Sequence, residues 1–264
     1  MLNKAKRGRP SKKVINNNVT FKVNTVKMND LSFDDSLFIP LKTKTRIDGF
    51  MSNEGGLMPG TLVAVVGDPG VGKTTVLLDM LADIQTSGKK CLFVSGEMNA
   101  IDMVGYVRRY PKMGDLDILF MGDYSEVNPD VVLRTALEEG YDAVLLDSMA
   151  EIADMYTDYF GGTNKSNQSR LLQLLEEHNL GKNKSKINTA FLVIQQVNKQ
   201  GQFSGSNKFK HMVTSMMDMR LGEEGRYLHF SKNRRGGNGN KLFFSLDTQN
   251  KVNYLHEEPM NQIA

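Results

Sequence analysis

The chain has 264 residues but only one cysteine, Cys91, and four scattered histidines. A single cysteine excludes a disulfide framework and a zinc site built from thiolates, and its place within an apolar run predicts a core position. No apolar run approaches the ~18 to 20 residues that a membrane-spanning helix requires. The N-terminus is basic and polar, without the apolar core of a secretory signal. We therefore expect a cytoplasmic protein without a membrane partner.

Charge is distributed unevenly along the chain, although 33 basic and 30 acidic residues give a net charge of only +3. Residues 1–13 hold six basic side chains and no acidic one, so the remaining 27 basic and 30 acidic residues sum to −3. Positive charge gathered in a terminal segment is typical of arms that bind nucleic acids. The apolar fraction of 40% is ordinary for a globular protein, and the length fits one large domain, or one domain with tails.

The basic segment contains Lys6-Arg7-Gly8-Arg9-Pro10, which resembles an AT-hook. An extended Arg-Gly-Arg fits the narrow minor groove of A·T-rich duplex DNA, whose negative potential favours Arg7 and Arg9. A basic tail that only increases solubility is the alternative interpretation. Residues 1–18 contain few large apolar groups, so we expect them to be disordered. Residues 19–50 mix polar with large apolar residues and are predicted to be a linker or a segment that docks on another subunit.

The most specific motif is a complete G-x-x-x-x-G-K-[ST] sequence between Gly67 and Thr74. An apolar run at 61–66 precedes it and a helical pattern follows, which is the strand–loop–helix setting that a phosphate-binding loop needs. Its glycines let consecutive N–H groups surround an anion at the positive end of the helix. We expect Lys73 to reach the β- and γ-phosphates of ATP and the Thr74 hydroxyl to bind Mg²⁺. The residues expected to contact ATP are Gly67, Asp68, Pro69, Gly70, Val71, Gly72, Lys73, Thr74 and Thr75.

Strands and helices alternate along residues 51–256, which we expect to form one α/β core of the P-loop NTPase type, followed by a tail at 257–264. Short apolar strands separated by helices indicate a mostly parallel sheet with helices on both faces. Closely spaced strands after residue 215 predict an antiparallel C-terminal extension. The predicted strands are 61–66, 91–95, 117–121, 142–147, 189–195, 216–221, 226–231, 241–246 and 252–255, and the predicted helices are 73–87, 98–109, 129–139 and 166–179.

Two long polar connections, at 157–168 and 198–212, are predicted to be loops. Both leave the C-terminal ends of predicted parallel strands, where α/β sheets bind ligands. Loops of this length within a compact domain are usually functional or disordered.

Polar side chains end three predicted strands beside the phosphate loop. Asp147 is expected to bind Mg²⁺ directly or through a water, with a simple helix cap as the alternative. Glu97 ends the adjacent strand, where a carboxylate can orient and deprotonate the attacking water, with a surface glutamate as the alternative. Gln195 and Gln196 end another strand, and one of these amides can sense the γ-phosphate. Because neighbouring residues of a strand point to opposite faces, only one of the two can do so, and we favour Gln196.

Basic residues far along the chain can complete such a site from another subunit. Residues 232–236, Lys-Asn-Arg-Arg-Gly, follow a predicted strand and precede a turn. Their cations can stabilise the γ-phosphate held by a neighbouring subunit, as arginine fingers do, with a solvent-exposed hairpin tip as the alternative. The predicted catalytic residues are Lys73, Glu97, Asp147, Gln196, Lys232 and Arg234.

Several of these segments together resemble the RecA-type core of bacterial RadA/Sms proteins. A run of the form K-x-G-x-x-x-G-x-x-x-x-x-H-x-V extends over residues 199–213 with every spacing kept. Residues 232–236 match a K-N-R-F-G signature, except that Arg235 replaces the aromatic residue. Ser95-Gly96-Glu97 matches the family's S-G-E, and Asp147-Ser148 its D-S. The resemblance implies a RecA-like P-loop ATPase.

Two further segments are similar to DnaB-type replicative helicases: Glu97-Met98 to their E-M pair, and Gln196-Val197-Asn198 to their Q-L-N sensor. The combined resemblance covers residues 45–250. It implies a DNA-dependent ATPase that uses ATP and Mg²⁺ and forms a homo-oligomer, either a hexameric ring or a filament, with ATP between subunits. It also implies a role in recombination, repair or replication, with partners from those systems and a location at the nucleoid or replisome of a bacterial cell.

The same resemblance places the loops after Ser148 and after Gln196 along a central path for single-stranded DNA. Lysines there can contact phosphates, and the rings of Phe203 and Phe209 can stack on bases, with packing of Phe209 within its loop as the alternative. The expected DNA-binding residues are Arg7, Arg9, Lys199, Phe203, Lys208 and Lys210.

Three functions remain open at this point. The first is a DNA motor, either a helicase or a branch-migration enzyme. The second is a mediator whose ATP binding controls strand annealing or helicase loading without movement along DNA. The third is a regulatory oligomer that resembles circadian-clock RecA ATPases and has no DNA substrate. The zinc finger and protease-like domain of RadA proteins have no counterpart here, which favours a minimal motor core, as in a phage- or plasmid-encoded protein.

Overall fold

The computed structural model describes residues 25–195, 207–236, 239–246 and 251–259. Contacts within the chain divide it into two units, residues 1–34 and 35–264. The described part of the first unit contains one short 3-10 helix, η1 (Met28–Asp30), which has no buried residue. The second unit holds the sheet and the other helices.

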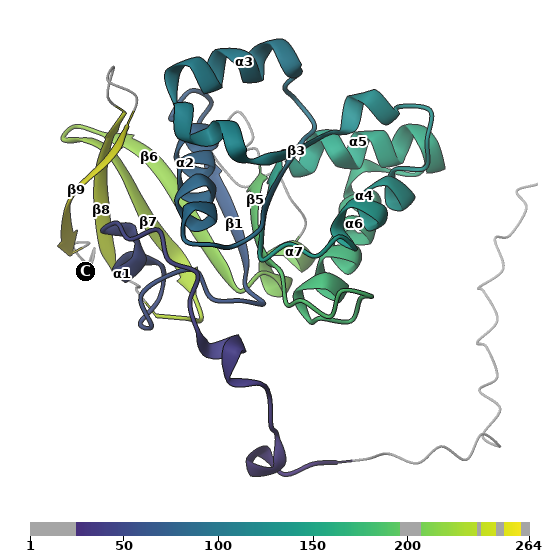
Figure 1. The fold of residues 1–264 in the computed structure, drawn as a ribbon, viewed down its shortest axis with the longest axis horizontal. Coiled ribbons are helices and arrows are strands. Elements are labelled where there is room, and N and C mark those ends of the chain that lie inside the picture. The colour runs from purple at the N-terminus through teal and green to yellow at the C-terminus, as the bar shows by residue number, and fades with distance from the viewer. Residues whose placement is uncertain (1–24, 196–206, 237–238, 247–250, 260–264) are drawn as a thin grey trace, which may run out of the picture. The chain divides into compact units, whose positions relative to one another are not determined.

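The second unit is built on a sheet whose nine described strands lie in the order β3-β2-β4-β5-β1-β6-β7-β8-β9 (Figure 1). The first six strands along the chain pair in parallel, whereas β7, β8 and β9 extend the sheet by antiparallel pairing. This architecture confirms the predicted α/β fold with its antiparallel extension. The strands are β1 (Leu62–Gly67), β2 (Cys91–Ser95), β3 (Asp117–Phe120), β4 (Ala143–Asp147), β5 (Ala190–Gln195), β6 (Ser215–Gly222), β7 (Gly225–Asn233), β8 (Asn240–Leu246) and β9 (Val252–Pro259).

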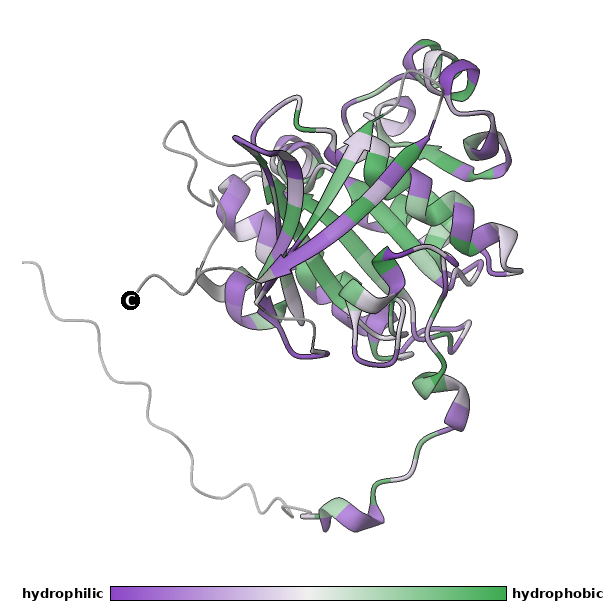
Figure 2. Cartoon of the chain, turned by 90° about the vertical axis from the view of Figure 1, so that its left-hand side faces the viewer, coloured by the Kyte–Doolittle hydropathy of each residue, from purple (hydrophilic) through white to green (hydrophobic). Residues whose placement is uncertain are grey.

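Helices cover both faces of the sheet. In β1, Val63 and Val65 join the core that includes α2, whereas Leu62 and Ala64 join the core that includes α4, α5 and α6. Figure 2 shows hydrophobic residues concentrated in the inner strands of the sheet, whereas the strand nearest the viewer is mostly hydrophilic. Among the described residues, no helix is both long and apolar enough to cross a bilayer. The helices are α1 (Ile47–Met51), α2 (Lys73–Thr86), α3 (Ala100–Arg109), α4 (Pro129–Leu137), α5 (Met149–Phe160), α6 (Asn164–Asn179) and α7 (Asn207–Met212), with the 3-10 helices η2 (Asp35–Phe38), η3 (Pro111–Asp115) and η4 (Met121–Tyr124).

The prediction of a loop at 157–168 is wrong. Helix α5 begins directly after Ser148, whose side chain accepts a hydrogen bond from Glu151 N as an N-cap, and α6 begins at Asn164. Residues 161–163 alone separate the two helices, and Gly161 ends α5 with a φ angle of 72°. The segment after Ser148, predicted to be a loop along a DNA path, is therefore a helical hairpin.

The predicted loop at 198–212 also contains a helix, because α7 occupies its last six residues. Phe209, a residue of α7, has its side chain completely buried in the core. Its ring cannot stack on a DNA base in this arrangement, so the alternative interpretation, packing, is the correct one. Residues 196–206 lie outside the described residues.

Candidate nucleotide-binding site

The chain passes from β1 into α2 through the phosphate loop, whose glycines have conformations that other residues rarely adopt. Gly70 and Gly72 have φ angles of 77° and 104°. A Cβ on Gly72 would lie 2.6 Å from Leu246 Cδ1, and a Cβ on Gly67 would collide with the carbonyl oxygen of Met219. Glycine is thus required both for the backbone conformation and for the close approach of β6 and β8.

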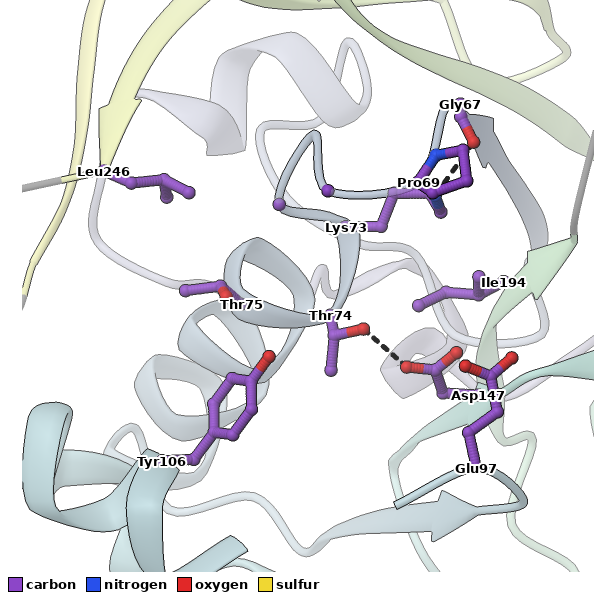
Figure 3. A pocket seen from close by; sticks show the side chains of 12 residues that line it. Gly67, Pro69, Lys73, Thr74, Thr75, Glu97, Tyr106, Asp147, Ile194 and Leu246 are labelled. Atoms are coloured by element: carbon purple, nitrogen blue, oxygen red, sulfur yellow. Dashed lines mark hydrogen bonds between the residues drawn. The ribbon is translucent and has the colours of Figure 1, made fainter. Parts of the chain in front are cut away.

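A cavity of about 480 Å³ opens over the loop, at the C-terminal ends of the parallel strands (Figure 3). Its volume and its mixed polar and apolar walls suit a nucleotide. Of the predicted ATP contacts, Asp68 and Val71 do not line it; Val71 is buried in the core, so only its backbone is available for a phosphate. The lining residues are Gly67, Pro69, Gly70, Gly72, Lys73, Thr74, Thr75, Glu97, Tyr106, Asp147, Ile194 and Leu246.

The Lys73 ammonium lies inside the curl of the loop. Its Nζ donates to the carbonyl oxygens of Gly67 at 2.8 Å and Asp68 at 2.9 Å. Burial lowers the pKa of Lys73, although nearby Asp147 and other carboxylates act in the opposite direction. A triphosphate would supply the negative charge that favours the ammonium form, so the site suits an anionic ligand.

Thr74 and Asp147 form the polar centre of the cavity. The Thr74 hydroxyl donates to Asp147 Oδ2 at 2.5 Å, and Figure 3 shows both side chains directed at each other. Asp147 is only 3% exposed. Burial raises the pKa of this carboxyl to about 6, although the hydrogen bond from Thr74 acts against the shift. A helix cap is therefore not the role of the Asp147 side chain, since Ser148 caps α5.

The residues present fit a magnesium ion that is shared with a nucleotide. Mg²⁺ prefers oxygen ligands and is often held by one or two side chains together with substrate phosphates. Thr74 and Asp147 offer a hydroxyl and a buried carboxylate at one point of the cavity. The described residues contain no group of three or more histidine, cysteine or acidic side chains that could hold a metal alone, so phosphate oxygens would complete the coordination.

Glu97 lies beside Asp147 at the C-terminal ends of the parallel strands. Ser95, two residues before it, pairs with Asp147 in the β2–β4 register, and Gly96 N donates to the Asp147 carbonyl oxygen at 2.7 Å. Figure 3 shows the Glu97 carboxylate next to that of Asp147, and the Glu97 side chain is exposed to the cavity. The two carboxylates differ in burial, which suits one for metal binding and the other for contact with water.

The family model described as the RecA N-terminal domain matches residues 42–210, which include the phosphate loop, Glu97 and Asp147. The chain belongs to the RecA family. Among solved structures, this RecA-type chain is similar to a KaiC-like protein from the hyperthermophilic archaeon Pyrococcus horikoshii OT3, with a TM-score of 0.61 over 83% of this chain and 98% of that chain. Their sequences are 16% identical, so the likeness shows the shared fold.

Curated proteins similar to this RecA-type chain include DNA repair protein RadA of three bacteria. The Streptococcus pneumoniae R6 protein is 30% identical over 224 residues, which are 81% of this chain and 49% of that protein. The Streptococcus pyogenes serotype M1 protein is 30% identical over 76% of this chain and 43% of its own length. The Aquifex aeolicus VF5 protein is 28% identical over 73% and 41%, respectively. The chain thus resembles RadA but spans less than half the length of these relatives.

The RecA-type pocket contains an apolar side that the sequence did not reveal. Tyr106 of α3 and Leu246 at the end of β8 lie on the side away from Asp147 and Glu97 (Figure 3). The Arg109 guanidinium lies 4.9 Å from the centre of the Tyr106 ring, which helps to hold the ring in place. A flat aromatic ring and an aliphatic side chain suit a nucleobase, whereas the opposite side suits phosphates.

The proposed γ-phosphate sensor lies at the limit of the described chain. Gln195 is the last residue of β5 and is completely buried, and Ile194 beside it lines the cavity. Gln196, the favoured candidate, lies outside the described residues. Its role remains a prediction.

Lys232 and Arg234 lie away from the cavity of their own chain. In β7, Asn233 pairs with Ser215 of β6, which in turn pairs with Val63 near the start of β1. The phosphate loop begins at Gly67, four residues further along, which corresponds to roughly 13 Å at the usual rise of a strand. The Lys232 ammonium donates to the carbonyl oxygens of Lys210 at 2.7 Å and Val213 at 2.6 Å, so it is not simply free in solvent.

The predicted DNA-binding residues are described only in part. Lys210 is exposed on α7, at the same end of the sheet as Lys232. The side chain of Lys208, also on α7, is outside the described part. Arg7, Arg9, Lys199 and Phe203 lie outside the described residues as well.

Proposed function

We propose that the protein is a DNA-dependent ATPase of RadA-like type, an oligomeric motor that acts on DNA during recombination, repair or replication. The observation that carries the proposal is the pocket in which the phosphate loop, the Thr74–Asp147 pair and Glu97 meet. These groups supply phosphate binding, metal binding and a base for water within one cavity. The similarity to RadA proteins over most of this chain supports DNA as the partner.

Each of the described side chains of the pocket has a different role in the hydrolysis of ATP. The N-terminus of α2 and the Lys73 ammonium bind the phosphates, while Thr74 and Asp147 would hold Mg²⁺, whose charge favours phosphoryl transfer when it is bound. Glu97 orients a water molecule toward the γ-phosphorus and accepts its proton as the bond to the β–γ bridging oxygen breaks. The proton moves to a carboxylate that is exposed to the cavity and therefore easily releases it to solvent.

Completion of the site requires a neighbouring subunit. Lys232 and Arg234 occupy the end of the sheet opposite the phosphate loop, so a head-to-tail arrangement of identical subunits would bring them to the next subunit's γ-phosphate. Such a heterologous contact generates a ring or a filament. In that assembly, Lys232 and Arg234 would stabilise the charge of the transition state from the second subunit.

The hairpin of α5 and α6 is a suitable border for the DNA path. Its tip carries Tyr159 with 49% exposure and Phe160 with 36% exposure, and the Arg170 guanidinium lies 3.7 Å from the centre of the Phe160 ring. Exposed aromatic rings with a nearby cation can stack on bases and contact phosphates. The exposed Lys210 on α7 provides a second contact for the backbone.

Single-stranded DNA should increase the rate of ATP hydrolysis by the wild-type protein, and Lys73→Ala should remove this activity, since the ammonium binds the phosphates that react. We expect kcat to fall at least about 100-fold, in line with the loss of one group that stabilises the transition state. The measurement is phosphate release with and without DNA, together with displacement of a labelled strand from a forked duplex. Hydrolysis without strand displacement would favour the mediator role. A rate that ignores DNA altogether would contradict the proposal.

Tyr106→Ala should raise the KM for ATP about tenfold with little change in kcat, because a stacked ring contributes roughly 1–3 kcal/mol to binding and does not touch the reacting phosphate. Tyr106→Phe is the matched control, since it keeps the ring and should keep the wild-type KM. Steady-state kinetics with ATP distinguish the two variants. An unchanged KM in Tyr106→Ala would show that the base does not lie at this side of the cavity.

A further inference from the structure

A loop outside the nucleotide site presents three lysines and no acidic residue. Residues 181–186 have the sequence Gly-Lys-Asn-Lys-Ser-Lys and join α6 to the start of β5. Because β1 and β5 are parallel neighbours, the loop lies at the end of the sheet opposite the phosphate loop. Lys182, Lys184 and Lys186 are all exposed.

The loop is held in one shape by Asn183. The Asn183 amide donates to the carbonyl oxygens of His178 at 3.4 Å and Ile187 at 3.3 Å. Its Oδ1 accepts from the Ser185 hydroxyl at 2.7 Å and from Lys186 N at 2.8 Å. These bonds support a left-handed backbone at Lys186, where φ is 56° and where a residue with a side chain is strained by about 1–2 kcal/mol. The lysines therefore project from a preformed backbone, which lowers the entropy lost on binding.

Two cations of the loop have no charged partner among the residues that the structure describes. Lys184 forms an ion pair with Glu138 at 2.7 Å, and nearby Arg134 is bound to carboxylates of α4 and α6. Within the described part of the chain, the ammonium groups of Lys182 and Lys186 have neither a hydrogen-bond partner nor an ion-pair partner. Positive charge that is unpaired and rigidly presented is suited to a polyanion.

An open cavity of about 550 Å³, whose walls mix polar and apolar surface, lies beside these lysines. One wall is His178, which is 1% exposed and whose Nδ1 has no hydrogen-bond partner among the described residues. Burial lowers the pKa of His178, so the imidazole is neutral at pH 7 and Nδ1 can donate in one of its two tautomers. The cavity is lined by Arg134, Glu138, His178, Gly181, Lys182, Asn183, Lys184 and Lys186.

We propose that the loop at 181–186 binds the phosphate backbone of DNA as a second contact surface, separate from the α5–α6 hairpin. This inference rests on the DNA-dependent ATPase proposed above. Helix α7 and Lys210 precede β6, which pairs with the start of β1, so they lie at the same end of the sheet as the loop. Lys182 and Lys186 add positive charge at the end of the sheet that also carries the exposed Lys210. We expect this surface to bind DNA without sequence preference, because lysine ammonium groups donate to phosphate oxygens rather than to base edges.

The test uses the double variant Lys182→Ala/Lys186→Ala in the full chain. Its matched control is Lys89→Ala/Lys90→Ala, which removes the same charge at the same end of the sheet. Lys89 lies 3.5 Å from a carboxylate oxygen of Asp142, and the Lys90 ammonium lies 4.3 Å from the centre of the Tyr141 ring, so both control lysines are already engaged. The affinity for a fluorescent single-stranded oligonucleotide is measured by anisotropy at several salt concentrations.

The test variant should bind DNA roughly tenfold more weakly at 0.1 M salt. The magnitude of its salt slope, the slope of log K against the logarithm of the salt concentration, should fall by about 1.4, or ~0.7 for each phosphate contact to a single strand that is lost. The control variant should keep the wild-type slope, and both variants should keep the wild-type unfolding midpoint because the substituted side chains are exposed. An unchanged slope in the test variant, or an equal fall in the control, would overturn this inference while the ATPase proposal stood. If the loop served an acidic protein partner instead, the slope would be unchanged. Absence of DNA binding by the wild-type protein would overturn both.

Discussion

Mixing two inactive variants, Lys73→Ala and Arg234→Ala, should restore ATP hydrolysis. Each variant alone lacks one half of the site. Loss of an arginine that acts from a neighbouring subunit lowers kcat by about 10³- to 10⁵-fold. In a mixed assembly, some interfaces combine an intact Lys73 from one subunit with an intact Arg234 from the next. If subunits mix at random and sites act independently, about one quarter of the head-to-tail interfaces are intact, so activity should approach a quarter of the wild-type rate.

The reason lies in the direction of β7. This strand is antiparallel to β6, so it carries the chain away from the phosphate loop and leaves Lys232 and Arg234 near the start of β1. No rotation of the two side chains returns them to the γ-phosphate in the same subunit, because the separation along the sheet is roughly 13 Å and an arginine extends only about half as far. The same residues must act in a second subunit or not in catalysis at all.

The outcome separates catalysis from a structural role. Arg234 Nη2 lies 3.5 Å from the carbonyl oxygen of His211, and Lys232 binds carbonyl oxygens in the same segment. If these bonds only stabilise the fold, mixtures remain as inactive as the separate variants and Arg234→Ala unfolds at a lower temperature. Arg234→Lys serves as the conservative control, because it keeps the charge but loses the forked geometry and should retain part of the rate. The measurements are phosphate release at several mixing ratios and the unfolding midpoint of each variant.

Sequence reasoning located the parts of the site that short motifs define. Lys73 and Thr74 follow fixed glycines. Asp147 ends the apolar strand β4, and Glu97 follows the apolar strand β2, which pairs with β4. Such features depend on a few neighbouring residues, so the sequence contains them directly. The parallel core could be predicted because its strands are short apolar runs separated by helices, and the antiparallel extension because the strands after residue 215 are closely spaced.

Features that depend on packing between distant segments could not be predicted. Tyr106 and Leu246 reach the same cavity only because β8 approaches the phosphate loop at Gly72. Helix α5 was missed in part because glycines and polar residues follow its last turn, although Ile152 and Tyr156 already have helical spacing. The burial of Phe209 depends on α7, which lies within a segment whose composition suggests a loop. In each case, contacts between segments that are distant in the sequence determine the position or burial of the residue.

Lys112→Met should destabilise the protein by roughly 3 kcal/mol. The substitution removes the cation that pairs with a buried carboxylate, Asp79, on the helix that follows the phosphate loop. Asp79 of α2 is only 2% exposed, and its Oδ1 lies 2.7 Å from the Lys112 ammonium. The same ammonium lies 2.8 Å from Asp83 Oδ1, one turn further along α2. Removal of one partner of a buried pair typically costs about 3–5 kcal/mol; the lower end applies here because the Lys112 side chain is 36% exposed. Urea denaturation at pH 7.5 measures the loss.

The matched control is Lys184→Met, which breaks the ion pair with Glu138. The Lys184 side chain is 81% exposed, so its loss should cost less than about 1 kcal/mol. The double variant Asp79→Leu/Lys112→Met should recover most of the stability, because an apolar pair of similar volume avoids the buried charge. Equal losses in Lys112→Met and Lys184→Met would contradict the argument, as would a double variant no more stable than Lys112→Met.

The loss of stability in Lys112→Met should also depend on pH and should become smaller as the pH falls. Burial is the main reason that the pKa of Asp79 is raised to about 6, while Lys112 opposes the shift. The folded state therefore holds a proton on Asp79 more tightly than the unfolded state, whose carboxyl has a pKa near its ordinary value. This group weakens folding above about pH 6, and the penalty disappears as the pH falls toward 4. Without Lys112 the pKa rises further, so the gap in stability between wild type and Lys112→Met should narrow between pH 7.5 and pH 5.5. A gap that stays constant or widens would show that Asp79 does not carry the uncompensated charge.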